Sequence, residues 1–427
     1  GRAPAAGDRL RNPDLADVLR RLVSEAKAGT SDREAQIENA RRAFYEGFVA
    51  EAIDKFVAST EVLDATGRRH RGLLTGDDLA SWRASVEPSV HLDYRGLTVH
   101  KPGPWSQGPV FLQQLALLEG FDLGGLDPNG DEYLHTVTEA AKLAFADREA
   151  WYGDPIDRPD SPLPTLLSPE YNAERRKLIR HEANLHPEPG RPDDRSPTLP
   201  WAPADPAPDW GEDWMDQLQS GMPTIVLKAT LKPSDTCTVA VADRHGNMVA
   251  AVPSGGWLKS SPVIPGLGFS LGTRGQTMWL IEGHPNTVAG GKRPRTTLSP
   301  TLVTRDGRPY LAFGTPGGDR QDQWTLETFL LIAEFGANLQ EATEAPLFHT
   351  DHFPSSFTPR GHRPGVMVTE AGVGAQTVEL LRRRGHVVDV VPELSLGGKT
   401  CIVGVGRDGF LRAGAGPRGR QAYAVSR

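Results

Sequence analysis

Three short segments in the second half of the chain carry hydroxyl, guanidinium and glycine groups that could act together in catalysis. They are residues 234–238 (SDTCT), residues 291–301 (GKRPRTTLSPT) and residues 314–320 (GTPGGDR). A threonine hydroxyl is a weak nucleophile that needs a base beside it, and backbone N–H groups at adjacent glycines can approach an oxyanion closely. Taken singly, each segment also fits a structural role, because threonine favours strands and paired glycines favour tight turns.

Three other motif matches lack the structural context that their chemistry requires. Residues 268–272 (GFSLG) match the GxSxG nucleophile elbow around Ser270, but prolines precede them and no helical pattern follows. Residues 414–419 match GxGxxG, yet they contain a proline and leave no room for the helix that must follow. His349 and His352 lack the spacing of a helical zinc motif. We therefore expect neither a dinucleotide cofactor nor a metal ion.

The overall composition is typical of a globular protein. The chain has 427 residues, of which 38% are hydrophobic and 24% charged, and its formal net charge is -7. This mild acidity, without a clustered basic face, argues against a nucleic-acid partner. No apolar stretch approaches the roughly 20 residues that a membrane span needs. Cys237 and Cys401 are too few for a disulfide framework, and we expect both to be packed, free thiols.

The first half of the chain has a mainly helical pattern. Asn12, followed by proline, is a typical helix start, and Thr75 with Asp78 resembles a capping box. A longer helix is predicted over about residues 131–151. Residues 187–210 hold eight prolines, which supply no backbone donor and exclude helices and inner strands. We expect this stretch to be an exposed, semi-rigid linker.

The second half has the alternation and turn residues of β-hairpins. Hairpins are predicted at residues 236–252, 302–314 and 402–413, helices at 326–335 and 376–384, and a strand at 387–391. Strands paired through tight turns, with helices in separate blocks, predict an α+β fold in which antiparallel sheets pack against helices.

The three catalytic-type segments, with several first-half segments in the same order, resemble the gamma-glutamyltransferase (gamma-glutamyltranspeptidase) family of Ntn (N-terminal-nucleophile) hydrolases. The first-half segments read RNPDLADVL from residue 11, LLTGDDLASW from 73, DYRGLTV from 93, LEGFDL from 118 and AFADR from 144. The resemblance implies a four-layer αββα sandwich, with antiparallel sheets between helical layers. It also implies a large-subunit part, residues 1–235, and a small subunit, residues 236–427, which together make one αββα domain.

Members of this family cut their own backbone before a threonine, and colinearity with the family implies a cut between Asp235 and Thr236. Thr236 would then be the N-terminal nucleophile. Its released α-amino group, with a pKa of about 7.7–8.0, would serve as the general base at neutral pH. The mature protein is expected to be a heterodimer of large and small subunits, or a dimer of such heterodimers, without a cofactor.

Other site residues follow from the same resemblance. Gly317 and Gly318 match the family's oxyanion-hole glycines. Ser254 matches a threonine that hydrogen-bonds the amine of the nucleophile, and Ser keeps the required hydroxyl. Thr296 and Thr297 match a serine pair whose hydroxyls hold the α-carboxylate of the substrate.

The sequence departs from the family where the glutamyl α-amino group is bound. The corresponding positions are Gly256 and, within a residue or so, Arg274. Because arginine offers only donors and positive charge, the amino subsite is expected to be absent or inverted in sign. The surrounding residues are most similar to the oxamate amidohydrolase-like branch of the family. We therefore expect hydrolysis of a small carboxylated amide, with Arg274 either facing an anionic substrate group or serving as a structural donor.

Two alternatives stay open: a true gamma-glutamyltransferase or glutathione hydrolase, and an unprocessed, non-catalytic family member. The family's large subunit has a further N-terminal stretch before the RNP segment, so we expect the large-subunit part to be N-terminally incomplete. The compartment also stays open between the cytoplasm, which we favour slightly, and an extracytoplasmic location.

Overall fold

The computed structural model describes most of the chain, and its residues group into two compact units. The first unit contains residues from 5–87 and 255–273, and the second contains residues from 88–199, 236–254 and 274–426. The expected subunit boundary after residue 235 is a proposed break in the backbone, so this grouping does not test it. The described residues are 5, 7–63, 67–157, 160–199, 236–255, 261–357, 360–420 and 422–426.

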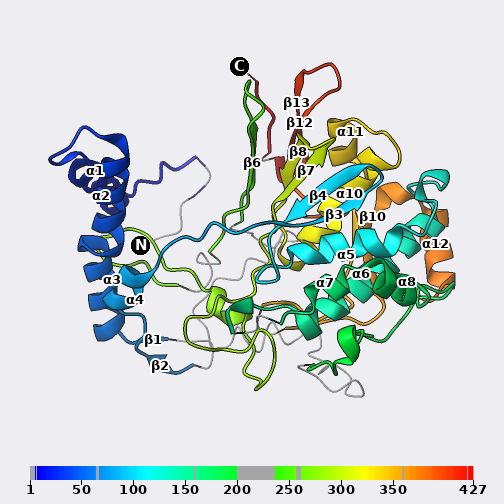
Figure 1. Cartoon of the computed structure of the whole chain (residues 1–427), viewed down its shortest axis with the longest axis horizontal. Coiled ribbons are helices and arrows are strands. Elements are labelled where there is room, and N and C mark those ends of the chain that lie inside the picture. The colour runs from blue at the N-terminus through cyan, green and yellow to red at the C-terminus, as the bar shows by residue number, and fades with distance from the viewer. Residues whose placement is uncertain are drawn as a thin grey trace. The chain divides into compact units, whose positions relative to one another are not determined.

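The first unit is built from helices (Figure 1). They are α1 (Pro13–Lys27), α2 (Arg33–Tyr45), α3 (Phe48–Ser59) and α4 (Gly76–Ser81), with a short antiparallel pair, β1 (Val62–Leu63) and β2 (Arg69–His70). The predicted helix start is confirmed, because Asn12 Oδ1 accepts a hydrogen bond from the Leu15 N–H at 3.0 Å. The predicted capping box is also confirmed at the start of α4, where Thr75 and Asp78 each accept from the backbone N–H of the other.

Residues 261–273 form an irregular segment of the first unit. Ile264 and Leu267 are buried in the same apolar cluster as residues of α1 and α3. Ser270 lies in this segment, and its hydroxyl donates to the Ser261 carbonyl at 3.2 Å. Among the described residues on either side of Ser270 there is no strand before it and no α-helix after it. The rejection of Ser270 as a nucleophile elbow is therefore supported.

The second unit is built on a six-stranded antiparallel sheet of order β13-β12-β8-β7-β4-β3. The strands are β3 (Val90–Tyr94), β4 (Leu97–Lys101), β7 (Thr301–Arg305), β8 (Arg308–Gly314), β12 (Cys401–Val405) and β13 (Leu411–Ala415). The predicted hairpins β7–β8 and β12–β13 are confirmed. Their turns contain Gly307 (φ 70°) and Gly409 (φ 80°), the left-handed conformation that favours glycine in tight turns.

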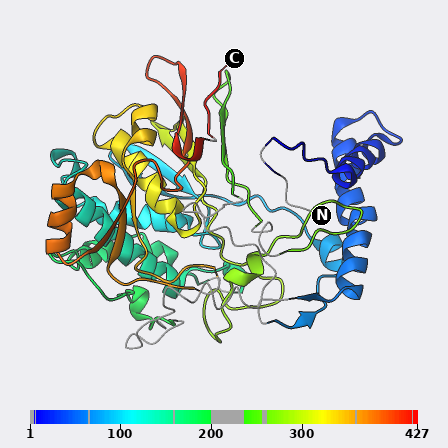
Figure 2. The same cartoon turned by 180° about the vertical axis from the view of Figure 1, so that it is seen from behind.

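Helices cover one face of this sheet (Figures 1 and 2). They include α5 (Gly108–Leu118) and α10 (Gln321–Ala333), and α6 (Asp131–Trp151) packs against α5. Phe111 of α5 and Phe329 of α10 meet Phe313 of β8, with ring centroids 5.8–6.5 Å apart, at the centre of the apolar core. The helix predicted over residues 131–151 is thus confirmed as α6, whereas α10 begins five residues before its predicted start.

A two-stranded hairpin, β5 (Val239–Ala242) and β6 (Met248–Ala251), packs on the opposite face of the sheet. Successive strand residues point to opposite faces, so Gly314 faces away from the helices that contact Phe313. A Cβ atom at Gly314 would lie 2.7 Å from Val252 Cγ2 and 3.2 Å from Thr238 Cγ2. The hairpin can approach the sheet here because residue 314 has no side chain. The α+β class and the antiparallel sheets are therefore confirmed.

The remaining elements of the second unit extend its helical side. They are α7 (Leu163–Leu166), α8 (Pro169–Arg176), α11 (Leu339–Glu344), β9 (Phe348–Thr350), β10 (Val366–Glu370), α12 (Ala375–Arg383) and β11 (Val387–Val391). β10 pairs with β9 antiparallel and with β11 parallel, the latter through α12. None of the helices in the described ranges combines the length and apolar character that a bilayer crossing requires.

The described part of the proline-rich stretch, residues 187–199, is not the exposed linker that the sequence predicts. Gly190 is buried; its N–H donates to Asp147 and its carbonyl accepts from Trp151 Nε1 at 3.1 Å. Pro192 is also buried. Prolines exclude regular ladders, but side chains of α6 can satisfy the backbone groups between them. Residues 200–210 lie outside the described residues.

The packing of the hairpin on Gly314 predicts the effect of an added methyl group. Gly314→Ala should lower the free energy of unfolding by about 1–3 kcal/mol, because the Cβ would overlap Val252. Gly290→Ala is the matched control, since nothing lies within 4 Å of a Cβ at that position. Thermal or urea unfolding of both variants measures the difference. Equal stabilities of the two variants would contradict the close approach.

Candidate active site

The hairpin sets Thr236 opposite Ser254. The β5–β6 pairing continues to Cys237, whose N–H donates to the Pro253 carbonyl at 3.2 Å. The same register, extended by one residue, aligns Thr236 with Ser254. Thr236 is half-buried, as is Ser254. This alignment agrees with the expected role of Ser254 near the amine of Thr236, which stays a prediction.

Cys237 lies on the other face of the hairpin, as strand alternation predicts, but it is exposed. The expectation of a packed thiol is therefore wrong for Cys237. Val239 and Val241 share this face and are each 49% exposed, so the whole face is open in the described part of the chain. Cys401, in β12, is partly buried, which raises the pKa of its thiol.

Gly317 and Gly318 form a turn just after β8 that favours glycine at both positions. Their φ angles are 146° and 59°. A Cβ on Gly317 would lie 2.5 Å from Trp324 Cζ3, and one on Gly318 would lie 3.2 Å from Phe357 Cε2. Within the described residues, neither glycine N–H donates to a protein acceptor. Two such donors could face a developing oxyanion, which remains the predicted role of the pair.

The segments that lead to Thr236 and to the glycine turn leave the sheet at the same end. Thr238 contacts Gly314, the last residue of β8. Thr236 lies two residues before this contact and Gly317 lies three residues after Gly314. Strand β5 runs away from the contact and β8 runs toward it, so both connecting segments leave at the same end.

Arg274 links the hairpin to the glycine turn. Its Nη2 donates to Ser254 Oγ at 2.6 Å, and its guanidinium lies 5.2 Å from the centroid of the Phe357 ring. The same ring is the neighbour that a Cβ on Gly318 would meet. The structure therefore brings Arg274, Ser254 and Gly318 together around Phe357, with a half-buried positive charge among them.

Thr296 and Thr297 differ in their surroundings. The backbone of Thr296 is held on both sides, because its N–H donates to Trp105 and its carbonyl accepts from the Gln107 N–H at 2.9 Å. Thr296 Oγ1 accepts from the Leu298 N–H at 3.2 Å. Thr297 is 1% exposed, and its hydroxyl has no hydrogen-bond partner among the described residues. Their role in carboxylate binding stays a prediction.

Two expected site residues lie outside the described residues. Asp235 would precede the cleaved bond. Gly256 is one of the positions at which the sequence departs from the family's binding subsite for the glutamyl α-amino group. Both roles remain predictions. The described residues that border them, Thr236 and Gly255, belong to the second and first unit respectively.

A buried polar cluster behind the glycine turn was not identified from the sequence. Arg148 of α6 is fully buried, and its Nη1 lies 2.6 Å from Asp319 Oδ1 and 3.0 Å from Gln107 Oε1. Asp319, next to Gly318, also accepts from the Ser356 N–H and hydroxyl. Arg148 ends the AFADR segment and Asp319 follows the glycine pair, but 171 positions separate them. Nothing in the spacing indicates that the two side chains pair.

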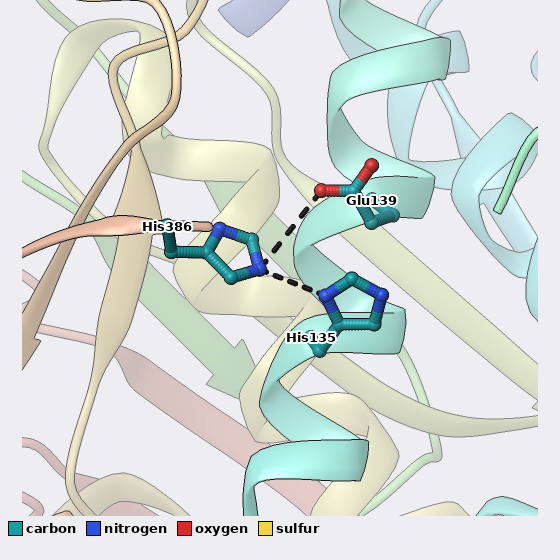
Figure 3. Close-up of side chains that lie close together, drawn as sticks. All are labelled: His135, Glu139 and His386. Carbon is teal, nitrogen blue, oxygen red and sulfur yellow. Dashed lines mark hydrogen bonds and ion pairs between the residues drawn. The ribbon is translucent and has the colours of Figure 1, made fainter. Parts of the chain in front are cut away.

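His135, Glu139 and His386 form a group that could in principle hold a metal ion (Figure 3). All three are buried, and His135 Nδ1 lies 2.8 Å from His386 Nε2. That distance is a hydrogen bond between the two imidazoles. Lys142 Nζ donates to Glu139 Oε1 at 2.6 Å, so an ammonium group already pairs with the only carboxylate of the group. We interpret the group as a buried polar cluster, in which His386 Nδ1 has no hydrogen-bond partner among the described residues.

Comparison with known proteins identifies the family. A family model described as gamma-glutamyltranspeptidase matches residues 1–426. The chain belongs to the gamma-glutamyltranspeptidase family. The prediction that it is a member of a family of hydrolases and acyl transferases is thereby confirmed.

Individual relatives of this gamma-glutamyltranspeptidase-family chain carry hydrolase and acylase names. The glutathione hydrolase-like YwrD proenzyme of Bacillus subtilis (strain 168) is 29% identical over 423 residues, covering 98% of this chain and 66% of that protein. A solved structure of the protein LmbA2991 is 48% identical with a TM-score of 0.88, covering 100% of this chain and 70% of that one. The cephalosporin acylase of Bacillus halodurans is 28% identical with a TM-score of 0.76, covering 100% and 65%.

These likenesses to solved structures confirm the Ntn-hydrolase fold expected from the sequence. The chain spans slightly under two thirds of the length of the YwrD proenzyme and about half of another curated relative.

The buried histidines predict a loss of stability in acid. Burial, with Lys142 nearby, lowers the pKa of His386 to about 2, and burial lowers the pKa of His135 to about 4. In the unfolded chain both histidines have a pKa of about 6.5. As the pH falls below that value the unfolded state binds protons that the folded state does not. Each histidine then costs about 1.4 kcal/mol of stability per pH unit until its folded pKa is reached.

His386→Gln should therefore flatten the fall in melting temperature between pH 7 and pH 5, whatever it does to stability at neutral pH. The control is His91→Gln, which changes an exposed histidine. Differential scanning calorimetry at several pH values makes the comparison. A pH slope that is unchanged in His386→Gln would contradict a buried neutral imidazole.

Proposed function

We propose that this chain is a self-processing amide hydrolase with an N-terminal threonine nucleophile, acting through an acyl-enzyme on a small carboxylated amide. The observation that carries the proposal is the packing of the Thr236 hairpin against Gly314, close in sequence to the Gly317–Gly318 turn. Relatives named as proenzymes support a product of two subunits, and relatives named as acylases support amide hydrolysis.

The proposed mechanism uses groups of one residue for attack and proton transfer. Self-cleavage before Thr236 frees its α-amino group, which accepts the proton of the Thr236 hydroxyl as Oγ1 attacks the amide carbonyl carbon. The N–H groups of Gly317 and Gly318 would stabilise the oxyanion. Collapse expels the amine, which takes the proton, and leaves an ester on Oγ1. Water then attacks this ester while the α-amino group of Thr236 accepts its proton, and that proton passes to Oγ1 as the acid leaves.

The Ser254 contact favours an anionic substrate group. Arg274 donates to Ser254 Oγ, and Ser254 lies opposite Thr236 in the hairpin register. A guanidinium at this place would attract a carboxylate and repel the ammonium of a glutamyl group. Thr296 and Thr297 could add hydroxyl donors to the same carboxylate.

Gamma-glutamyl transfer, or glutathione hydrolysis, is the second candidate. It is favoured by relatives whose names are glutathione hydrolase and glutathione hydrolase-like proenzyme. Parallel assays with gamma-glutamyl-p-nitroanilide and oxamate separate the two candidates. Strong glutamyl turnover that rises with an acceptor amine would favour the transferase.

Removal of the Thr236 hydroxyl tests the nucleophile. Thr236→Ala should abolish both cleavage into residues 1–235 and 236–427 and the turnover of either amide. Cys237→Ala changes the next residue, an exposed thiol. It should change the rate of self-cleavage and the rate of amide turnover by no more than about twofold. Intact mass spectrometry and product assays measure the two outcomes. Activity retained in Thr236→Ala would overturn the mechanism, whereas an uncut, inactive wild type would support the non-catalytic alternative.

Arg274→Gln tests the anionic subsite. Loss of a charge-assisted hydrogen bond should lower kcat/KM for oxamate by about 10–100-fold. The kcat/KM for oxamide, a substrate in which a neutral amide replaces the carboxylate, should fall much less. Arg308→Gln, at the exposed start of β8, is the control for loss of one positive charge. Equal losses for both amides would show that Arg274 acts through Ser254 rather than on the substrate.

A further inference from the structure

Gln107, just before α5, touches both parts of the proposed site. Its backbone N–H donates to the Thr296 carbonyl at 2.9 Å. Its side-chain Nε2 donates to the Gly318 carbonyl at 3.3 Å. Gln107 itself is fully buried, and its side-chain hydrogen bond to Gly318 is partly buried. One residue thus connects the segment of the threonine pair with the glycine turn.

Two donors hold the peptide between residues 318 and 319, because the Gly318 carbonyl accepts from the Gln107 side chain and from the Gln321 N–H. The Arg320 N–H donates to the Gly317 carbonyl at 3.2 Å, which fixes the preceding peptide. In a trans peptide the C=O and the N–H point in opposite directions. With the Gly317 carbonyl turned toward Arg320, the Gly318 N–H points to the other side. Gln107, Gln321 and Arg320 therefore hold two peptides of a turn whose glycines would otherwise have wide conformational freedom, and one of these peptides carries the Gly318 N–H.

Gln107 is in turn held by a buried ionic network. Its Oε1 accepts from Arg148 Nη1, which also contacts Asp319. Arg148 Nη2 lies 2.6 Å from Glu149 Oε1, and Arg295 Nη2 donates to the same oxygen at 2.6 Å. Arg295 immediately precedes Thr296. Two cations and two carboxylates therefore balance one another between the two proposed subsites.

The carboxylate of Glu149 stays ionised at neutral pH. Burial by itself would raise the pKa of Glu149, but Arg295 and Arg148 outweigh burial and lower that pKa to about 2. Arg295 Nη1 also donates to the Arg148 carbonyl at 2.9 Å. The network thus supports Gln107 through buried ion pairs and charge-assisted hydrogen bonds.

We propose that Gln107, held by Arg148, is a positioning residue that sets the oxyanion-hole turn and the carboxylate-binding segment at a fixed separation. The inference rests on the proposed function. Gln107 touches neither the substrate nor the reacting atoms; it acts through the Gly318 carbonyl and the Thr296 backbone. A displacement of either part would misalign the acyl carbon between Thr236 and the oxyanion donors.

The test compares two buried glutamines. Gln107→Met keeps side-chain length and the backbone hydrogen bond but removes the contacts to Gly318 and Arg148. Gln114→Met, on α5, is the matched control, because Gln114 is equally buried and its Nε2 donates to the Val110 and Asp322 carbonyls. Steady-state kinetics with oxamate and with gamma-glutamyl-p-nitroanilide are normalised to the fraction of chains cleaved before Thr236.

Per cleaved chain, Gln107→Met should lower kcat by about 10–100-fold, since small misplacements of an aligned site cost this much. Gln114→Met should leave kcat within about threefold. Gln107→Glu keeps an acceptor for Arg148 but loses the amide donor to Gly318, so it should resemble Gln107→Met in kcat.

Two results would overturn the inference: equal kcat in Gln107→Met and Gln114→Met, or full kcat in Gln107→Glu. Failure of the proposed function gives a different pattern, because wild type itself would then be uncleaved or inactive, or Thr236→Ala would remain active.

Discussion

The need to neutralise buried charge dominates the second unit. Arg148 and Arg295 are almost completely buried, and their partners are Glu149 and Asp319. Leaving one such charge without its partner costs about 3–5 kcal/mol, so the four side chains must stay together. They come from α6, from the segment of the threonine pair and from the turn after β8. Charge pairing thus fixes the relative positions of three segments that are distant in sequence, and the proposed catalytic groups are attached to those segments.

The three charge-paired segments form a framework, and the hairpin of Thr236 packs against it through apolar contacts rather than ion pairs. It lies on the opposite face of the sheet from the helices and approaches through Gly314. Because its register sets Thr236 opposite Ser254, and Arg274 binds Ser254, a positive charge lies beside the proposed nucleophile. In the proposed mechanism, the framework and the hairpin together would hold an anionic acyl group next to the Thr236 hydroxyl.

Local patterns predicted much of the fold. Capping residues at Asn12 and Thr75, the tight turns at Gly307 and Gly409, and the helix over 131–151 are determined within a few neighbouring residues. The predicted site residues that the structure describes depended on resemblance to a family, since a threonine or glycine pair has no distinctive local signal. Pairing of Arg148 with Asp319, the packing of residues 187–199 and the exposure of Cys237 arise only from tertiary contacts, which no local pattern encodes.

The central claim is that Thr236 becomes an N-terminal residue whose own amine activates its hydroxyl. Chemical labelling of free α-amino groups, followed by tandem mass spectrometry of the purified active protein, tests it most directly. Self-cleavage before Thr236 predicts a labelled peptide that begins at Thr236 with the sequence TCTVAVADR, in proportion to activity. An active protein whose only labelled N-terminus is that of the intact chain, or one cut at another bond, would contradict it.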